Sequence, residues 1–343
     1  SIEYIHHLHM SGDTEGLAEA LSEEGHSLVK AGHIELLGIL RVLEASLFGP
    51  RTRFVIHELT GDILSIQGRW DEAEEQYDHA LPIAVKHKLT TPLARIYSSR
   101  ADLAVKKGEM DNALSLHKKA LEMQIKLRDA QGAARSYNNM GYIFRRQRDN
   151  KRAIEVYGNV EELLESEDSP DLTEARIRLA SAFLEMGEMD RARDHAMKAH
   201  DETAENNQEK LHARSRAVLG RYYARIKDND LAMHHYTGAL EILSDQSDPR
   251  SAVEVEILLG QVLSDAGSTE EAAQHYLDAL TIAEANDFRM MQGEILSRLG
   301  EVESNRSQRM DYLQRSLVVF RELGAVDRMR EVQNSVHRVV MGH

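Results

Sequence analysis

The segment NNMGYIF, residues 138–144, decides the fold, because small residues recur along most of the chain at the position of its glycine, Gly141. We call these positions the landmarks. They are Gly61, Ala101, Gly141, Ala180, Gly220, Gly260 and Gly300, at steps of 40, 40, 39, 40, 40 and 40 residues. A fixed period of this length is typical of stacked structural units. The sequence therefore predicts a repeat protein.

Three further positions follow the same period. An alanine lies 12 residues after each of the first six landmarks, at Ala73, Ala113, Ala153, Ala192, Ala232 and Ala272. Four residues later most units have a tyrosine, at Tyr77, Tyr157, Tyr236 and Tyr276, and three residues beyond it a small residue, at Ala80, Ala120, Ala199, Ala239 and Ala279, with Val160 as the exception. Small residues let two helices approach closely, and the aromatic ring fills the gap beside them. Each unit is predicted to be an antiparallel helical hairpin.

Glycines mark the expected turns inside the hairpins. They occur in the dipeptides Gln67-Gly68, Lys107-Gly108, Met186-Gly187 and Ala266-Gly267. Glycine commonly ends a helix because it adopts a left-handed backbone without steric cost. After the last of these turns, Ser268 and Glu271 have the spacing of a capping box, which predicts a helix start at Ser268.

The composition favours helices and excludes several classes of function. Aromatic residues make up 5% of the chain and charged residues 29%, which suits helices better than sheets. The absence of cysteine excludes a disulfide framework and a thiolate zinc site, and is compatible with a reducing compartment, so we expect a cytoplasmic protein. A net charge of -15 and the lack of a long apolar run predict no direct binding to nucleic acid and no membrane segment.

The ends of the chain depart from the period. Gly25 and Gly32 have the same spacing as Gly61 and Gly68 and lie 36 residues before them, so the first unit is shorter than 40 residues. Such a departure is expected for terminal repeats. Four parts are predicted: an N-terminal segment over residues 1–13, a degenerate capping hairpin over 14–48, an array of units of about 40 residues over 49–323, and a C-terminal capping helix over 324–343.

This pattern resembles tetratricopeptide repeats (TPRs) across nearly the whole chain. The resemblance implies an all-α fold, a right-handed TPR superhelix of about eight antiparallel helical hairpins. The 40-residue unit and the opening phrase HHLHMSGDTEGLAEALSEEG, residues 6–25, are more narrowly similar to the MalT-like sensor region of STAND signal-transduction ATPases. In that family a nucleotide-binding module precedes the superhelix, which receives an inducer or a partner. With Ser1 in place of an initiator methionine, we expect an ATPase module upstream in the natural protein.

In TPRs, the first helix of each hairpin lines the concave surface, and this resemblance selects the candidate binding residues. They are Arg95, Ser98, Ser99, Arg135, Asn138, Asn139, Tyr142, Arg145, Arg146, Arg178, Arg214, Arg221 and Arg225. Arginine donors match carboxylates, and asparagine amides can satisfy an extended peptide backbone. The expected ligand is a peptide, a protein domain or a small inducer in the groove, and a basic lining favours an acidic segment.

An alternative interpretation assigns the arginines a structural role. In this interpretation they pair with Glu174, Glu185 and Glu254 on a solvated face, as most charged helix positions do. In the unit at Gly61, the groove positions carry Glu58 and Asp62, which argues against a clamp for a C-terminal carboxylate. Both interpretations remain open from the sequence.

The sequence contains no motif for catalysis or for a cofactor. It has no GxxxxGK[ST], GxGxxG, HExxH or GxSxG segment. His6, His7 and His9 point to different faces of a helix, so no metal site is expected. The sequence thus predicts a non-enzymatic binding domain, the C-terminal sensor of a STAND-type ATPase; the alternative is a stand-alone TPR scaffold that binds an acidic or extended peptide.

Overall fold

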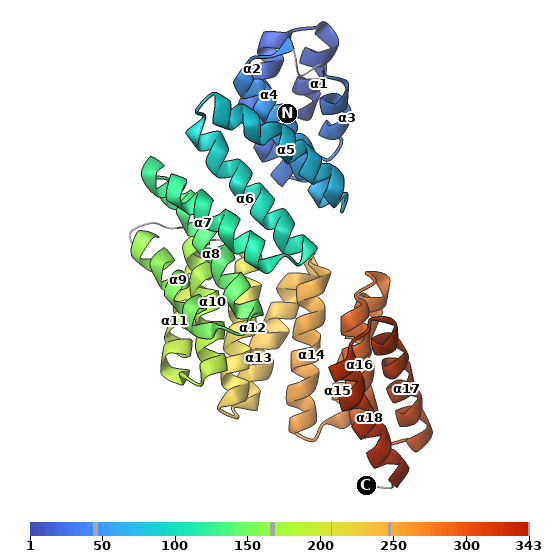
Figure 1. Cartoon of the computed structure of the whole chain (residues 1–343). Helices are drawn as coiled ribbons and strands as arrows, with labels where there is room; N and C mark the ends of the chain where they lie inside the picture. The colour runs from blue at the N-terminus through green and yellow to red at the C-terminus, as the bar shows by residue number, and fades with distance from the viewer. Residues whose placement is uncertain (44–46, 165–168, 207, 246–247, 342–343) are drawn as a thin grey trace. The chain divides into compact units, whose positions relative to one another are not determined.

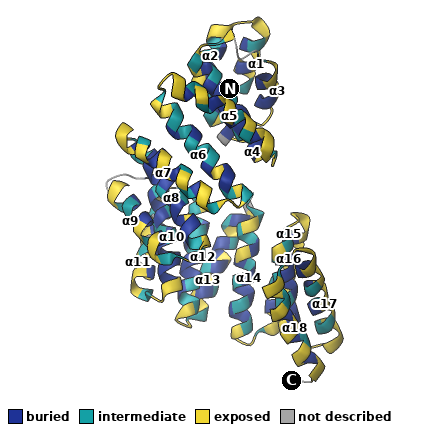
Figure 2. Ribbon diagram, in the orientation of Figure 1, coloured by how far each residue is buried: buried dark blue, intermediate teal, exposed yellow. Residues whose placement is uncertain are grey.

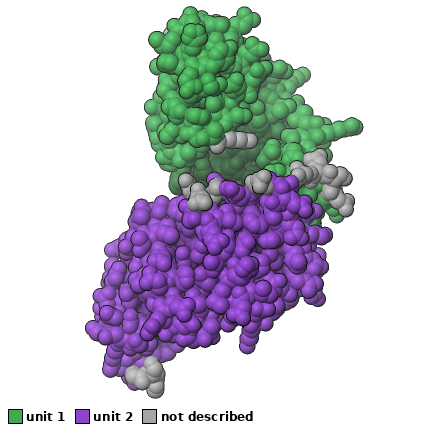
Figure 3. All heavy atoms as spheres, turned by 180° about the vertical axis from the view of Figure 1, so that it is seen from behind, with its two compact units in different colours: residues 1–172 green, residues 173–343 purple. Residues whose placement is uncertain are grey.

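The computed structural model describes residues 1–43, 47–164, 169–206, 208–245 and 248–341. Within these residues the chain forms eighteen helices and no strand (Figure 1). The prediction of an all-α repeat fold is confirmed. The chain divides into two compact units, Ser1–Leu172 and Thr173–His343, which we call unit 1 and unit 2 (Figure 3).

Unit 1 contains the first nine helices. They are α1 (Ile2–Ser11), α2 (Thr14–Lys30), α3 (Leu36–Val42), α4 (Pro50–Ile66), α5 (Trp70–Lys86), α6 (Thr90–Lys107), α7 (Met110–Leu127), α8 (Ala130–Arg146) and α9 (Asn150–Leu164). The pairs α4 and α5, α6 and α7, and α8 and α9 pack closely as hairpins. Helix α2 packs on α4, and α4 also contacts α6. The first helices of successive hairpins are therefore neighbours.

Unit 2 has the same construction. Its helices are the greater part of α10 (Pro170–Met186), followed by α11 (Met189–Glu205), α12 (Glu209–Arg225), α13 (Asn229–Asp245), α14 (Pro249–Asp265), α15 (Thr269–Ala285), α16 (Arg289–Val302), α17 (Arg306–Glu322) and α18 (Val326–Met341). The hairpins α12 and α13, α14 and α15, and α16 and α17 pack closely. Within the described part of the chain, no helix combines the length and the hydropathy needed to span a membrane.

The landmark glycines make room for the tyrosine of the same hairpin. A Cβ atom placed on Gly141 would lie 2.3 Å from the ring of Tyr157, and one on Gly61 would lie 2.4 Å from Tyr77. Corresponding separations at the other two pairs are 2.5 Å for Gly220 with Tyr236 and 2.6 Å for Gly260 with Tyr276. All four tyrosines are buried, and Figure 2 shows buried residues along the helices of both units. A side chain at these landmarks would displace the ring that fills the hairpin.

Two hairpins use a larger landmark with a smaller partner. Sixteen residues after Ala101 stands His117, and sixteen residues after Ala180 stands Ala196, both buried. In the hairpin of Gly300 the shorter turn brings Leu313 to the tyrosine position, and a Cβ atom on the glycine would lie 2.7 Å from it. An alanine landmark thus goes with a partner smaller than tyrosine in two hairpins, and Gly300 goes with Leu313.

The turns within the hairpins use a left-handed residue seven positions after the landmark. Gly68, Gly108, Gly187 and Gly267 have φ values between 76° and 90°, and Arg148 and Lys227 adopt 61° and 63° at the same position. The predicted capping box at Ser268 is wrong. Ser268 is the N-cap of α15, but its hydroxyl makes no capping hydrogen bond, and its ψ of 65° lies outside the extended region typical of such caps.

Candidate ligand-binding cleft

A polar cleft of about 430 Å³ opens in unit 1 across the first helices of its hairpins. Its lining residues come mainly from α2, α4, α6 and α8: Ser22, Glu23, His26, Glu58, Asp62, Thr91, Ala94, Arg95, Ser98, Ser99, Asp102, Gln124, Asp129, Arg135, Ser136 and Asn139. Five of the candidate residues lie here, namely Arg95, Ser98, Ser99, Arg135 and Asn139. The remaining candidates lie outside this cleft.

Arg95 is committed to a partner inside the cleft. Its Nη2 and Nε atoms donate to the two carboxylate oxygens of Glu58 at 2.8 and 3.1 Å. The Nε2 atom of His26 lies 2.8 Å from the same carboxylate, and the Glu58 side chain is only 1% exposed. A bidentate pair of this kind is well oriented. Arg95 therefore compensates a buried carboxylate and offers little free positive charge.

Asp62 and Asp102 line the cleft, and among the described residues neither forms an ion pair with an arginine or a lysine. The Tyr77 hydroxyl donates to Asp62 at 2.7 Å, and the Asn139 amide donates to Asp102 at 3.0 Å. Burial, followed by the nearby Glu58 carboxylate, raises the pKa of Asp62. Burial and then the charge of Asp62 raise the pKa of Asp102 to about 6. Each group would be stabilised by a positive charge in the cleft.

His117 lies behind Asp102 at the position that tyrosine occupies in most hairpins. Its side chain is fully buried, and neither ring nitrogen has a hydrogen-bond partner among the described residues. Its Nε2 atom is 3.6 Å from the Asp102 Oδ1 atom, too far for a hydrogen bond. Burial lowers the pKa of His117 to about 4. The imidazole is therefore neutral and does not balance the aspartate.

Asn138, Asn139 and Arg135 have different surroundings although they share α8. Asn139 lies in the cleft, whereas Asn138 is buried and donates its amide to the Asp171 carbonyl oxygen at 2.8 Å. The Arg135 Nη1 atom lies 3.5 Å from the Asp171 carboxylate, with half of its side chain exposed. Farther along α8, Tyr142 is 37% exposed and Arg146 is exposed, while Arg145 is partly buried.

Two of the four candidate arginines of unit 2 pair with the same glutamate. Arg178 and Arg214 both form ion pairs with Glu174, and the Arg214 Nη2 atom lies 3.0 Å from its Oε1 atom. Burial acts to raise the pKa of Glu174, but the two guanidinium groups outweigh it and lower the pKa. Arg221 lies 3.9 Å from Glu185, and Arg225 is exposed at the end of α12. Pairing with Glu174 and Glu185 is the alternative that the sequence left open.

The expectation of a basic lining does not hold for the cleft of unit 1. Its lining contains five carboxylates, Glu23, Glu58, Asp62, Asp102 and Asp129, but only two arginines. One of these arginines is held by Glu58. Glu58, Asp62 and Asp102 were visible at groove positions in the sequence. Whether each carboxylate has a cationic partner, however, depends on which side chains meet across neighbouring hairpins. The signal in the sequence was that Asp62 and Asp102 occupy equivalent positions in the first two 40-residue units.

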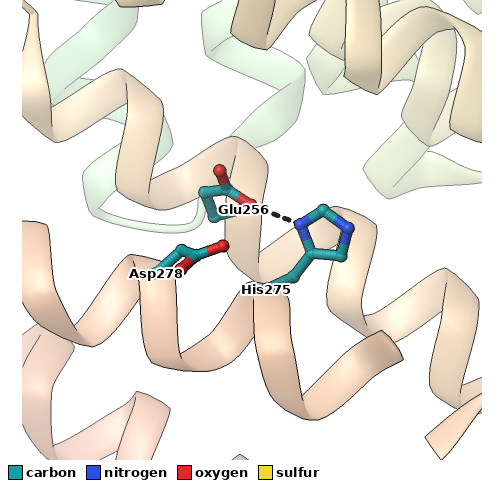
Figure 4. A group of neighbouring side chains, drawn as sticks. All are labelled: Glu256, His275 and Asp278. Atoms are coloured by element: carbon teal, nitrogen blue, oxygen red, sulfur yellow. Dashed lines mark hydrogen bonds and ion pairs between the residues drawn. The ribbon is translucent and has the colours of Figure 1, made fainter. Parts of the chain in front are cut away.

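Unit 2 also contains a group with the geometry of metal ligands. Glu256 from α14 and His275 and Asp278 from α15 point toward one another, with their nearest ligand atoms within 4.8 Å (Figure 4). The interactions already present account for this arrangement. The His275 Nδ1 atom lies 2.7 Å from the Glu256 carboxylate, and Gln274 donates to Asp278 at 3.0 Å. We therefore interpret the group as an ion pair that joins the two helices of this hairpin.

The match to a family model settles the family. Residues 49–292 match the model of the MalT-like TPR region, which is more than half of the chain. The chain belongs to the MalT-like TPR family. The matched residues of this MalT-like TPR chain run from the start of α4 into α16 and include the whole of the cleft except its α2 side. No curated protein matches the sequence.

Solved structures share the TPR-type fold. A STAND protein with a tetratricopeptide repeat sensor from Pyrococcus horikoshii aligns with a TM-score of 0.69 and 14% identity, over 94% of this chain and 50% of that chain. The apo form of RapI aligns with a TM-score of 0.67 and 15% identity, over 95% and 99%. A Rap protein complexed with competence and sporulation factor aligns with a TM-score of 0.61 and 12% identity, over 96% and 100%. At these identities the likeness concerns the fold.

Proposed function

We propose that this MalT-like TPR chain is a non-enzymatic sensor domain that binds its ligand in the cleft of unit 1. The observation that carries the proposal is the cleft itself, since side chains from three successive hairpins and from α2 converge on one hollow. Its volume lies within the range of about 300 to 1,000 Å³ that is usual for ligand pockets, and its lining offers polar groups to a ligand. A repeat array supplies such sites on its exposed faces without catalytic groups.

We infer a peptide or a partner's polypeptide segment as the ligand. The cleft has hydroxyl and amide groups from Ser98, Ser99 and Asn139 that can bond an extended backbone. The fold likeness to a Rap protein in complex with competence and sporulation factor supports a bound effector on this type of scaffold. We do not carry forward the preference for an acidic segment, because carboxylates outnumber arginines in the lining.

The cleft is tested by filling it. A phage-displayed library of random dodecapeptides is selected on the immobilised chain, and the enriched peptides are measured against two variants. In Ser99→Trp the new ring occupies the cleft. In Ser115→Trp the same change is made at an exposed position of α7. We expect Ser99→Trp to weaken binding on the order of tenfold or more, and Ser115→Trp to bind like the parent. Equal binding by all three proteins would place the ligand elsewhere.

We further propose that the domain regulates a STAND-type ATPase. Support comes from the family match and from the fold likeness to the Pyrococcus horikoshii STAND protein, of which this chain aligns with half. The natural gene is therefore expected to encode a P-loop ATPase module with the sensor. Sequencing the gene and measuring ATP hydrolysis by the full-length product, with and without a selected peptide, tests this role. A gene without an ATPase module would leave the stand-alone scaffold.

A further inference from the structure

The cleft of unit 1 contains a pair of carboxylates that form no ion pair with an arginine or a lysine among the described residues. Asp62 on α4 and Asp102 on α6 occupy equivalent positions, each one residue after its landmark, and both line the cleft. Among the described residues, neither has an arginine or lysine within ion-pair distance, although Glu58 beside them has Arg95. Two neighbouring carboxylates with only neutral donors repel each other.

The nearby groups that could carry a positive charge do not hydrogen-bond to Asp102. The charge of Lys106, one turn along α6, favours the ionised form of Asp102, but its ammonium group donates to the Ser65 hydroxyl at 2.8 Å and to the Ser65 carbonyl at 3.2 Å. His117 lies directly behind Asp102. It is fully buried, has no hydrogen-bond partner among the described residues, and faces the carboxylate across 3.6 Å.

The comparison between hairpins shows what the histidine removes. In the hairpin of Gly61, the Tyr77 hydroxyl donates to Asp62 at 2.7 Å. In the next hairpin His117 replaces the tyrosine and supplies no such bond to Asp102. Within the described part of the chain, the Asn139 amide is the side chain that donates to this carboxylate, at 3.0 Å. Asp102 thus keeps acceptor capacity that faces the cleft, because a carboxylate accepts about four hydrogen bonds.

We propose that Asp62 and Asp102 together bind a cationic group of the ligand, the guanidinium of an arginine or the ammonium of a lysine. This inference rests on the proposed function and names the chemistry of its site. Planar guanidinium donors can reach two carboxylates at once, and the bound cation offsets their mutual repulsion. The hydroxyl and amide groups around the pair then bind the adjacent backbone. A basic peptide segment, rather than an acidic one, fits this cleft.

The test uses the complete chain with carboxyl-¹³C-labelled aspartate. N-acetyl-arginine amide is titrated by NMR, with N-acetyl-citrulline amide as the uncharged control of nearly the same shape. We expect the arginine compound to shift the Asp62 and Asp102 carboxyl signals saturably and to lower the pKa of Asp102, since a cation favours the ionised acid. The citrulline compound should cause no saturable shift. Equal responses to both compounds would overturn the proposal.

Variants distinguish the pair from general electrostatics. Asp62→Asn with Asp102→Asn is compared with Asp190→Asn with Asp230→Asn, which removes the same charge from exposed positions in unit 2. We expect the first double variant to bind the arginine compound on the order of tenfold more weakly and the second to bind it like the parent. Circular dichroism verifies that both fold. Unchanged binding by the first variant contradicts the proposal.

Two further experiments distinguish a free amine from a peptide as the source of the cation, and failure of the cation inference from failure of the proposed function. Spermidine supplies ammonium groups without a peptide backbone; if it binds the pair more tightly than selected arginine-containing peptides do, the ligand is a free amine and the peptide assignment is overturned. If Ser99→Trp blocks the selected peptides but these lack arginine and lysine, the cleft is the site and only the cation inference fails. If Ser99→Trp blocks none of them, the proposed function fails first.

Discussion

The hydrogen atom that forms the side chain of each landmark glycine decides the packing of its hairpin. At Gly61, Gly141, Gly220 and Gly260 the ring of a tyrosine occupies the space that a methyl group would fill, whereas in the hairpin of Ala101 the tyrosine position holds His117. The two positions are sixteen residues apart, yet their sizes are coupled through direct contact. Coupling of this kind predicts non-additive effects of mutation.

A pair of substitutions measures the coupling. His117→Tyr should destabilise the protein by about 1 to 3 kcal/mol, because the ring would overlap the Ala101 methyl group. Adding Ala101→Gly should restore much of this loss, although glycine in a helix itself costs roughly 1 kcal/mol. Urea unfolding of the parent, both single variants and the double variant gives the coupling energy. A double variant less stable than His117→Tyr alone would show that the two residues do not share the space.

Asp102 illustrates a residue whose ionised form opposes folding. Its pKa is raised from 3.8 to about 6, so the folded protein binds more protons than the unfolded chain between these values, and its stability falls as the pH rises through this window. Half of the side chain is exposed, and solvent screening reduces the effect. Asp102→Asn should therefore stabilise the protein by about 1 kcal/mol at pH 7.5 and have little effect below pH 3.8.

Urea unfolding at both pH values checks this expectation, with Asp190→Asn as the exposed control. A loss of stability at pH 7.5 for Asp102→Asn would mean that the carboxylate contributes more through its bond with Asn139 than it costs. The same substitution is expected to weaken cation binding, so stability and binding should change in opposite directions. A functional site commonly shows this opposition.

At the scale of elements, a histidine cluster joins α11, α12 and α13 in unit 2. The rings of His200 and His212 have centroids 4.8 Å apart, and His235 stacks on Tyr223 at 5.3 Å. Burial, followed by the charge of Arg216, lowers the pKa of His235 to about 4. Burial and neighbouring charges also lower the pKa of His212. At neutral pH the His235 ring in this cluster is therefore uncharged.

Acid should loosen this part of unit 2. Between pH 6.5 and 4, His235 binds a proton in the unfolded chain but not in the folded protein. The contribution of His235 to the free energy of unfolding is therefore full above pH 6.5 and declines as the pH falls. His235→Gln should remove about 1 kcal/mol of that decline. His275 is the matched control with the opposite sign, since its bond with Glu256 raises its pKa and its contribution is lost as the pH rises. Equal pH profiles for parent and His235→Gln would contradict the assignment.

The helices and their pairing could be predicted because the signals are local and recur, with seven landmarks, four tyrosines and four turn glycines. In each hairpin the landmark, the tyrosine and the turn glycine are close in sequence, and each of them has one steric role. The charge of the cleft could not be predicted in the same way. Glu58 and Arg95 are 37 residues apart and meet only because α4 and α6 are neighbours. Whether an arginine is available to a ligand therefore depends on pairing across hairpins.

His117 shows what a closer comparison of repeats could have found. It stands at the tyrosine position, so the loss of a hydroxyl donor beside Asp102 is visible once Tyr77 is known to bond Asp62. The sequence alone does not reveal that bond. By contrast, Glu174, Arg178 and Arg214 carry spacings of one helical turn and one repeat, and their pairing was correctly considered as an alternative.

At the scale of the whole molecule, both units repeat one hairpin but use it differently. Unit 1 keeps carboxylates in its cleft with few cationic partners, whereas unit 2 satisfies Glu174 with two arginines. The candidate arginines therefore divide between the units, and a combined variant of both sets would mix two effects. We expect substitutions of Arg178 and Arg214 to reduce stability through the unpaired Glu174 and to leave ligand binding in the cleft unchanged.

Hydrogen–deuterium exchange of the complete chain, with and without a saturating selected peptide, tests the central claim most directly. Ligand binding in the cleft should slow exchange in the segments that line it, in α4 (Pro50–Ile66), α6 (Thr90–Lys107) and α8 (Ala130–Arg146), because bound segments open less often. The partner helices α5 and α7 should change less. Protection confined to unit 2, or to α5 and α7 without α4 and α6, would contradict the assignment of the cleft as the ligand site.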